Sequence, residues 1–311
     1  MRFSVRLALL GTLAAAAIPS VAGAPDPAFS SYWHDGKAEL DGYRLTVERY
    51  GHTRRGRAVA IFVTEPFSRT KHVKLDDPSK VAGDEIGVLK LNLVRDFQTG
   101  IYDYHTMLSL FAAEADFRTV KTTFSSSEWC GQVYEELNSH GTKLSQRVAS
   151  YFEGEAAERE LDLPANAVQE DDLFILLRGL RGAYLGPGEK RTVPLLASPF
   201  FRRLAHRTTV WATATIERRA RPETIQVPAG SFSVDVFEVR PDDGRSGRFD
   251  VERAYPHRII RWSWKPAAGA SPLGGTDAGE LTGSTRLAYW RTHDPGDERL
   301  LQELGVAQGV R

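Results

Sequence analysis

The single cysteine of this 311-residue chain, Cys130, lies in the string SSSEWCGQVY at residues 125–134. A cysteine reacts as a nucleophile through its thiolate, which nearby cations favour and nearby carboxylates disfavour. The neighbouring charge in the sequence is Glu128, so the string does not predict an activated nucleophile. We instead predict a structural role for Cys130, as a small apolar side chain buried beneath Trp129.

The eight histidines form no HxH or HExxH pair, the spacings typical of metal ligands on one element. The chain also contains no GxSxG, GxxxxGK[ST] or GxGxxG motif, which are the local signatures of common hydrolase and nucleotide sites. The sequence therefore predicts no catalytic residue, no metal site and no cofactor. His105 falls on the strand face opposite Tyr104, where we expect it to be exposed or to line a lumen.

Aromatic residues suggest a binding role. In the run RIIRWSWK at 258–265, Trp262 and Trp264 share one strand face, while His257 and Arg261 share the other. We predict that Trp262 and Trp264 are structural, and that other aromatic residues line an apolar cavity with a few polar groups at its mouth, as in most ligand sites. The candidate ligand-binding residues are Tyr104, His105, Trp129, His257, Arg261 and Arg286.

The elements that must position these residues are mostly strands. Residues 43–50, 89–97 and 102–110 alternate apolar and polar side chains, which is typical of a half-buried strand. Similar runs lie at 117–129, 132–137, 143–152, 157–163, 191–197, 208–218, 231–240, 247–255, 258–265 and 280–290, separated by turn-forming Gly, Pro, Asn and Asp. We predict an all-β fold, a long antiparallel meander that curls into a barrel or half-barrel because so many strands exceed what an open twisted sheet tolerates.

Two short helices are expected within this single β domain of residues 25–311. Residues 169–180 place leucines at 173, 176, 177 and 180, the spacing of one helix face. Residues 295–304 begin with proline and acidic residues and are followed by Gly305, which are helix start and stop signals. An outer-membrane barrel is the competing all-β interpretation, but charges on both strand faces at 251–253 and the polar C-terminal segment argue against it.

Residues 1–24 are predicted to be a signal peptide. Arg2 and Arg6 precede a short apolar run at 7–18, and small residues follow, so that cleavage after residue 22, 23 or 24 is expected. The apolar run is shorter than the roughly 20 residues that span a bilayer. Removing this segment takes away two of the 40 basic residues and none of the 40 acidic ones, which changes the formal net charge from zero to −2.

The overall composition excludes several function classes. Hydrophobic residues make up 41% of the chain and charged residues 26%, which is typical of a globular protein rather than a disordered one. Because basic and acidic residues are equal in number, the chain lacks the basic excess that nucleic-acid binding requires. A single cysteine excludes an intrachain disulfide. We therefore expect a protein that binds no nucleic acid and is not integral to the membrane once the leader is removed.

Several motifs together resemble a known group. They are EWCGQVY at 128–134, VPAGSF at 227–232, YPHRIIRW at 255–262 and GELTGS at 279–284, with Arg286, Tyr289 and Trp290. As a set they resemble exported bacterial proteins of unknown function over most of residues 30–292, and the C-terminal half is similar to a periplasmic family of unknown function with a barrel-like β fold. The resemblance implies an exported barrel-like protein and supplies no activity.

The sequence thus leaves three functions open. The first is a periplasmic or secreted envelope protein that binds an apolar or amphiphilic, lipid-like ligand in a curled sheet. The second is an enzyme acting on envelope glycans or lipids, with a site assembled from residues distant in sequence. The third is a structural or interaction module with a filled core. A pocket joining His, Asp and Ser favours the enzyme, and an aromatic-lined cavity favours the binding protein.

Overall fold

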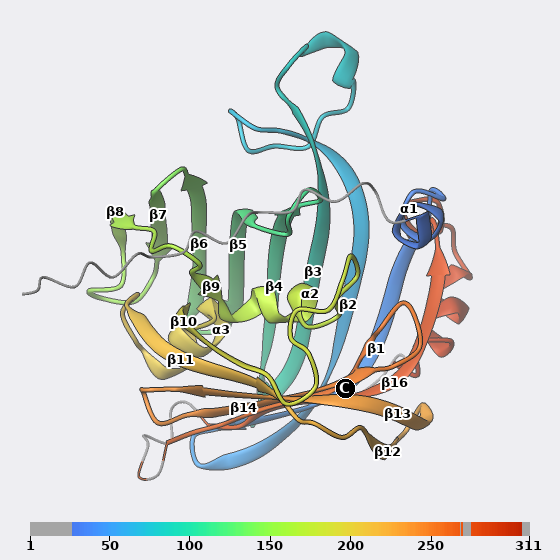
Figure 1. Cartoon of the computed structure of the whole chain (residues 1–311). Coiled ribbons are helices and arrows are strands. Elements are labelled where there is room, and N and C mark those ends of the chain that lie inside the picture. Colours follow the sequence, from blue (N-terminus) through green and yellow to red (C-terminus); the bar gives the residue numbers. More distant parts are fainter. Residues whose placement is uncertain (1–26, 268, 270–274, 307–311) are drawn as a thin grey trace, which may run out of the picture.

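The computed structural model describes residues 27–267, 269 and 275–306 (Figure 1). The signal peptide predicted for residues 1–24 lies outside this part of the chain. The helices are α1 (Pro27–Trp33), α2 (Leu173–Leu176) and α3 (Pro199–Ala205), with 3-10 turns η1 (Pro78–Lys80), η2 (Glu170–Asp172), η3 (Tyr289–Arg291) and η4 (Asp297–Gln302). The strands are β1 (Ala38–Arg49), β2 (His52–Ser68), β3 (Glu85–Thr99), β4 (Tyr102–Ala113), β5 (Thr119–Glu128), β6 (Gly131–His140), β7 (Lys143–Ser150), β8 (Ala157–Asp162), β9 (Val168–Gln169), β10 (Lys190–Leu196), β11 (Trp211–Arg218), β12 (Glu223–Val227), β13 (Gly230–Pro241), β14 (Ser246–Glu252), β15 (Ile259–Lys265) and β16 (Asp277–Leu287).

These strands form where side chains alternate between two environments. In β3, Leu89, Leu91 and Leu93 are fully buried, while the intervening Lys90 and Asn92 are only partly covered. Such a period-2 pattern holds a strand in register because a slip of one residue would expose every apolar side chain. The prediction of an all-β fold is confirmed.

The described strands make one 16-stranded sheet with a mostly antiparallel order. Its path runs β8-β7-β6-β5-β4-β3-β2-β1-β16-β15-β14-β13-β11-β10-β9, with β12 paired to β13. The sheet curls but does not close by hydrogen bonds in the described residues, since the path ends at β8 and β9. Leu196 on β10 nevertheless packs with Leu137 and Leu144 on β6 and β7, so the two ends meet through side chains. The result is a half-barrel.

Aromatic and aliphatic side chains fill the concave side of this half-barrel. Trp262 is fully buried, with its ring 4.6 Å from that of Tyr43 and 5.2 Å from that of Phe174 on α2. Trp264 is also buried in this core. Gly279 on the neighbouring strand makes room for the Trp262 ring, because a Cβ there would lie 2.1 Å from the indole. The interior is therefore packed with side chains.

The helical segments differ from the predicted ones. At 169–180 the chain forms the 3-10 turn η2 and the single turn α2, because three consecutive acidic residues, Glu170, Asp171 and Asp172, are all buried with polar partners that hold them in place. At 295–304 the chain forms the 3-10 helix η4 rather than an α-helix. Helices α1 and α3 were not predicted. Ser198 caps the start of helix α3, because its side chain accepts a hydrogen bond from the Phe200 backbone N–H.

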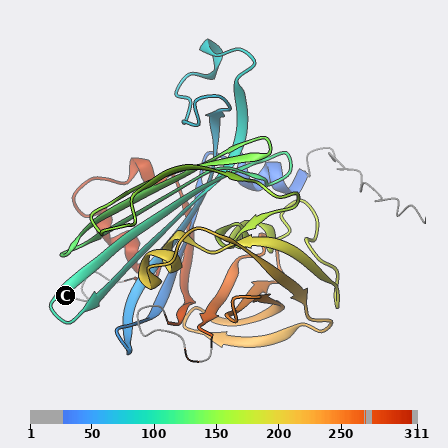
Figure 2. The same ribbon diagram turned by 90° about the vertical axis from the view of Figure 1, so that its left-hand side faces the viewer.

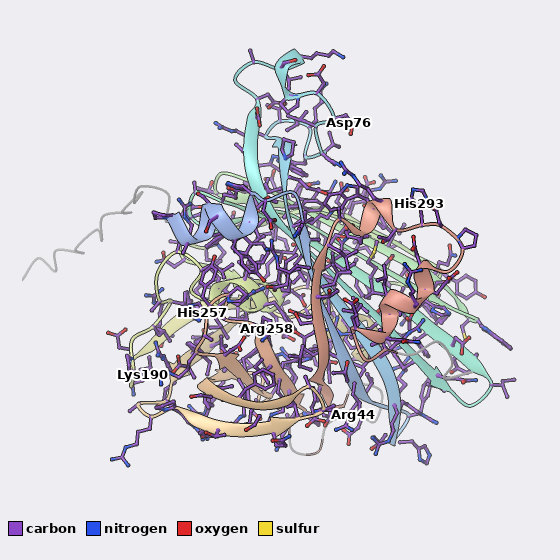
Figure 3. All side chains as sticks on the ribbon, turned by 90° about the vertical axis from the view of Figure 1, so that its right-hand side faces the viewer. Arg44, Asp76, Lys190, His257, Arg258 and His293 are labelled. Atoms are coloured by element: carbon purple, nitrogen blue, oxygen red, sulfur yellow. The ribbon has the colours of Figure 1, made fainter. Side chains whose placement is uncertain are left out.

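Across the described ranges, no helix has the length and apolar character needed to cross a bilayer. The connection between β2 and β3 forms a polar arm that projects from the half-barrel, and Asp76 marks this arm in Figure 3.

Candidate functional site

A cleft of about 470 Å³ lies where the two ends of the curled sheet approach each other. We call it the edge cleft. Its walls come from the β4–β5 turn, the β6–β7 turn, residues 163–169, and strands β10 and β11. About half of its lining side chains are apolar: Phe117, Leu163, Pro164, Ala165, Ala167, Val168, Leu176, Tyr184, Val193 and Trp211. This size and mixed character are those of a small-molecule site, which usually measures roughly 300–1,000 Å³.

Asp172 brings a buried carboxyl group to this cleft. It accepts a hydrogen bond from the Gln169 backbone N–H at 2.7 Å and another from the Thr119 hydroxyl. Burial raises the pKa of Asp172 to about 7, and these two donors limit the rise by favouring the charged form. A carboxyl group that changes charge near neutral pH within a hollow marks a candidate site.

A cation stands at the polar side of the edge cleft. The Arg191 guanidinium carbon lies 4.8 Å from the centre of the Tyr184 ring, and Arg191 itself is exposed. Trp211 lies on the neighbouring strand β11, where its indole Nε1 donates to the Asp162 carbonyl at 3.0 Å. The arrangement offers apolar surface, the exposed Arg191, the buried Asp172, and an exposed ion pair between Arg118 and Asp116 at 3.3 Å. It can therefore accept a molecule with an apolar part and a polar head.

None of the residues predicted to bind ligand lines the edge cleft. Tyr104 is fully buried and stacks on Phe97 with ring centres 4.7 Å apart. His105 is exposed, and its Nδ1 lies 2.9 Å from Asp96 on the neighbouring strand. These two residues of β4 point to opposite faces of the sheet, as the strand period requires.

The predicted burial of Cys130 beneath Trp129 is wrong. Both residues occupy the tight turn between β5 and β6, where Cys130 is exposed and Trp129 retains 70% of its accessible surface. Glu128, just before the turn, is the buried residue, and it forms an ion pair with Arg203 of α3. Trp129 and Cys130 are apolar, but they remain exposed because a hairpin turn has no neighbouring strand to cover it.

The three remaining candidates lie apart from the edge cleft, and their charged groups are engaged within the fold. Arg261 is 2.6 Å from Asp250, and Arg286 is 2.9 Å from Asp35 with its guanidinium over the Tyr32 ring. The His257 Nδ1 lies 3.1 Å from the Glu252 carbonyl oxygen, in the turn that follows the cis Tyr255–Pro256 bond. Figure 3 shows His257 beside Arg258 below α1.

Sequence reasoning missed the edge cleft because five segments far apart in the chain build it. Three of its polar residues, Thr119, Asp172 and Arg191, belong to different elements, and no motif links them. One signal was present. The run EDD at 170–172 lies between the apolar residues Val168 and Leu173, a position that is compatible with burial.

A search of the described residues finds no group of three or more His, Cys, Asp or Glu side chains placed to hold a metal ion.

Two solved structures are similar to this chain. The crystal structure of a beta-barrel-like protein of domain of unknown function DUF1849 from Brucella abortus covers 80% of this chain and 97% of its own, with 12% sequence identity and a TM-score of 0.47. A putative outer membrane lipoprotein-sorting protein domain from Vibrio parahaemolyticus covers 89% of this chain and 94% of its own, with 9% identity and a TM-score of 0.20. No family model and no curated protein matches the sequence.

Proposed function

We propose that this protein is an exported envelope protein that binds a small amphiphilic ligand in the edge cleft. The observation that carries the proposal is the cleft itself, about 470 Å³ in volume, in which apolar side chains meet the exposed Arg191 and the buried Asp172. The packed interior of the half-barrel supports a site at the margin of the sheet rather than in the lumen, where the aromatic residues suggested it.

The location in the periplasm or outside the cell is supported by the sequence of residues 1–24, a basic start, a short apolar run and small residues. A fusion of residues 1–30 to a reporter that is active only after export tests this part. Export of the reporter is the expected result, and retention in the cytoplasm would contradict it.

Binding can be tested with dodecylphosphocholine below its micelle concentration. The expected result is saturable binding to the purified protein in a calorimetric titration. Ala167→Phe should abolish it, because Ala167 lines the edge cleft and a phenyl ring there occupies the space that the alkyl chain needs.

Ala220→Phe serves as the matched control, since Ala220 is exposed between β11 and β12 and lines no part of the cleft. It should bind as the unmodified protein does. Equal binding by both variants, or none by the unmodified protein, would contradict the proposal. Mass spectrometry of the purified protein then identifies any ligand that it carries from the cell.

A further inference from the structure

Four successive hairpins place their turns along one edge of the β1–β8 half of the sheet. Because antiparallel strands reverse direction at each turn, the β1–β2, β3–β4, β5–β6 and β7–β8 connections all lie on the same side. In Figure 2 they follow one another along the left and lower-left side, in blue, teal and green. Each connection carries one exposed large side chain: Tyr50, Ile101, Trp129 and Tyr151. We call this set the tip row.

Three of these side chains, Ile101, Trp129 and Tyr151, are the most exposed large hydrophobic residues in the described part of the chain. Ile101 retains 79% of its accessible surface, Tyr151 72% and Trp129 70%, and Tyr50 retains 40%. At the opposite edge, the β4–β5 and β6–β7 turns carry no residue of this kind among those described, and the β2–β3 connection carries Val73, which is 46% exposed. The three largest apolar exposures in this half of the sheet thus lie on one edge.

The fold itself holds two members of the tip row in place. The Tyr50 ring lies under the Arg49 guanidinium at 4.3 Å, and its hydroxyl is 3.2 Å from that of Tyr104. Tyr151 packs against Gly131, where a Cβ would come within 2.5 Å of the ring. Because these side chains are already ordered, a partner that contacts them meets a smaller entropy cost.

The spacing of the row indicates which partner it fits. Strands lie about 4.8 Å apart, so neighbouring tips are separated by about 10 Å and the row is about 30 Å long. A stable protein interface buries ~800 Å² on each side. Aromatic side chains bury about 150–250 Å² when fully covered, and these four are already partly covered, so together they fall short of that area. The exposed polar side chain of Gln132, beside the Trp129 turn, also separates them.

A bilayer surface takes up such side chains one at a time. Trp and Tyr prefer the interfacial region, where the ring is apolar and the N–H or O–H stays hydrated. Arg54 and Arg55 follow the Tyr50 turn and complement anionic headgroups, whereas Asp103 and Glu153 on the neighbouring tips oppose them. We propose that the tip row docks this protein on the interfacial region of a lipid bilayer, chiefly through its rings. The edge cleft lies at other turns, those between β4 and β5 and between β6 and β7.

The test is co-sedimentation with vesicles of phosphatidylethanolamine and phosphatidylglycerol in a three-to-one ratio. The protein is prepared from residue 25, because the apolar segment predicted as its leader would bind lipid by itself. Every described strand lies between residues 38 and 287, so this shortening leaves the sheet intact. The variant Ile101→Ser, Trp129→Ser, Tyr151→Ser removes the three most exposed side chains of the row. We expect its partition onto vesicles to fall roughly tenfold or more.

The matched variant Met107→Ser, Tyr134→Ser, Trp290→Ser removes three exposed hydrophobic side chains outside the row and should partition as the unmodified protein does. A fluorophore on Cys130, the single thiol, should shift to shorter wavelength when vesicles are added. Three results would overturn the proposal: no vesicle binding by the unmodified protein, equal loss in both variants, or self-association through the tips without vesicle binding. Circular dichroism establishes that the variants are folded. The outcome is independent of ligand binding in the edge cleft.

Discussion

The carboxylate of Glu39 and the guanidinium of Arg178 lie 2.7 Å apart, and neither side chain has any accessible surface. Arg178 also donates to the Pro256 carbonyl at 3.0 Å and stands over the Phe62 ring. Glu39 accepts a hydrogen bond from the Tyr32 hydroxyl at 2.7 Å. This ion pair joins the wall of the half-barrel at β1 to the segment after α2 that fills its interior.

Removing one partner of this pair should destabilise the protein strongly. Glu39→Gln leaves the Arg178 charge buried without a counter-ion, a change that typically costs about 3–5 kcal/mol. We expect the urea midpoint of unfolding to fall accordingly. Glu280→Gln is the control, because it breaks the exposed Arg44–Glu280 pair on the same sheet, and surface pairs contribute about 0–1 kcal/mol. Equal losses in the two variants would refute the role given to burial.

Stability should fall as the pH rises through neutrality. Burial, reinforced by the nearby charge of Glu39, raises the pKa of Asp41 to about 8, and burial raises that of Asp172 to about 7. A carboxyl group whose pKa is higher in the folded chain than in the unfolded one holds its proton more tightly when folded. Its contribution is complete below the ordinary pKa and is lost as the pH passes through 7 and 8. Thermal unfolding at pH 8.5 should occur at a lower temperature than at pH 5.5.

Asp41→Asn should flatten this dependence, because the amide does not titrate. Asp76→Asn, on the exposed arm between β2 and β3, should leave the slope unchanged. A slope that survives in Asp41→Asn at full strength would show that other groups cause it.

Cys130 should react rapidly with a thiol reagent in the folded protein. Its exposure on the β5–β6 turn leaves the sulfur open to solvent. Cys130→Ser should change the free energy of unfolding by less than about 0.5 kcal/mol, as is usual for an exposed site. The reaction is followed by absorbance with and without denaturant. If labelling requires denaturant, Cys130 is buried in the folded protein, as the sequence suggested, and this prediction is wrong.

Gly279→Ala should be strongly destabilising. The added methyl group would meet the ring of Trp262, which is fully buried and cannot move aside. Overpacking of this kind typically costs about 1–3 kcal/mol. Gly87→Ala on β3 is a suitable control, since its methyl group would meet only the flexible end of the Glu114 side chain. Similar unfolding midpoints for the two variants would contradict this account of the core.

The strands were predictable because each alternates within a short window, as Leu89, Leu91 and Leu93 illustrate. The curl was predictable from the number of strands. The interior was not, because whether Trp262 lines a cavity or fills it depends on Tyr43 and Phe174, which come from distant parts of the chain.

The candidate site was beyond sequence reasoning for a related reason. Arg261 and Arg286 were predicted to bind ligand, but the fold gives each an internal carboxylate, Asp250 and Asp35. Arg191 carried no motif and stands exposed at the edge cleft. Which arginines keep their charge available is decided by tertiary contacts.

Quenching of Trp211 fluorescence tests the central claim most directly. Trp211 lines the edge cleft, whereas Trp129 lies on the tip row. An amphiphile with a brominated alkyl chain quenches an indole only when the two are in contact. The account predicts that this amphiphile quenches the unmodified protein and the Trp129→Phe variant equally, and that quenching disappears in Trp211→Phe. Quenching that persists in Trp211→Phe would place the ligand elsewhere and contradict the account.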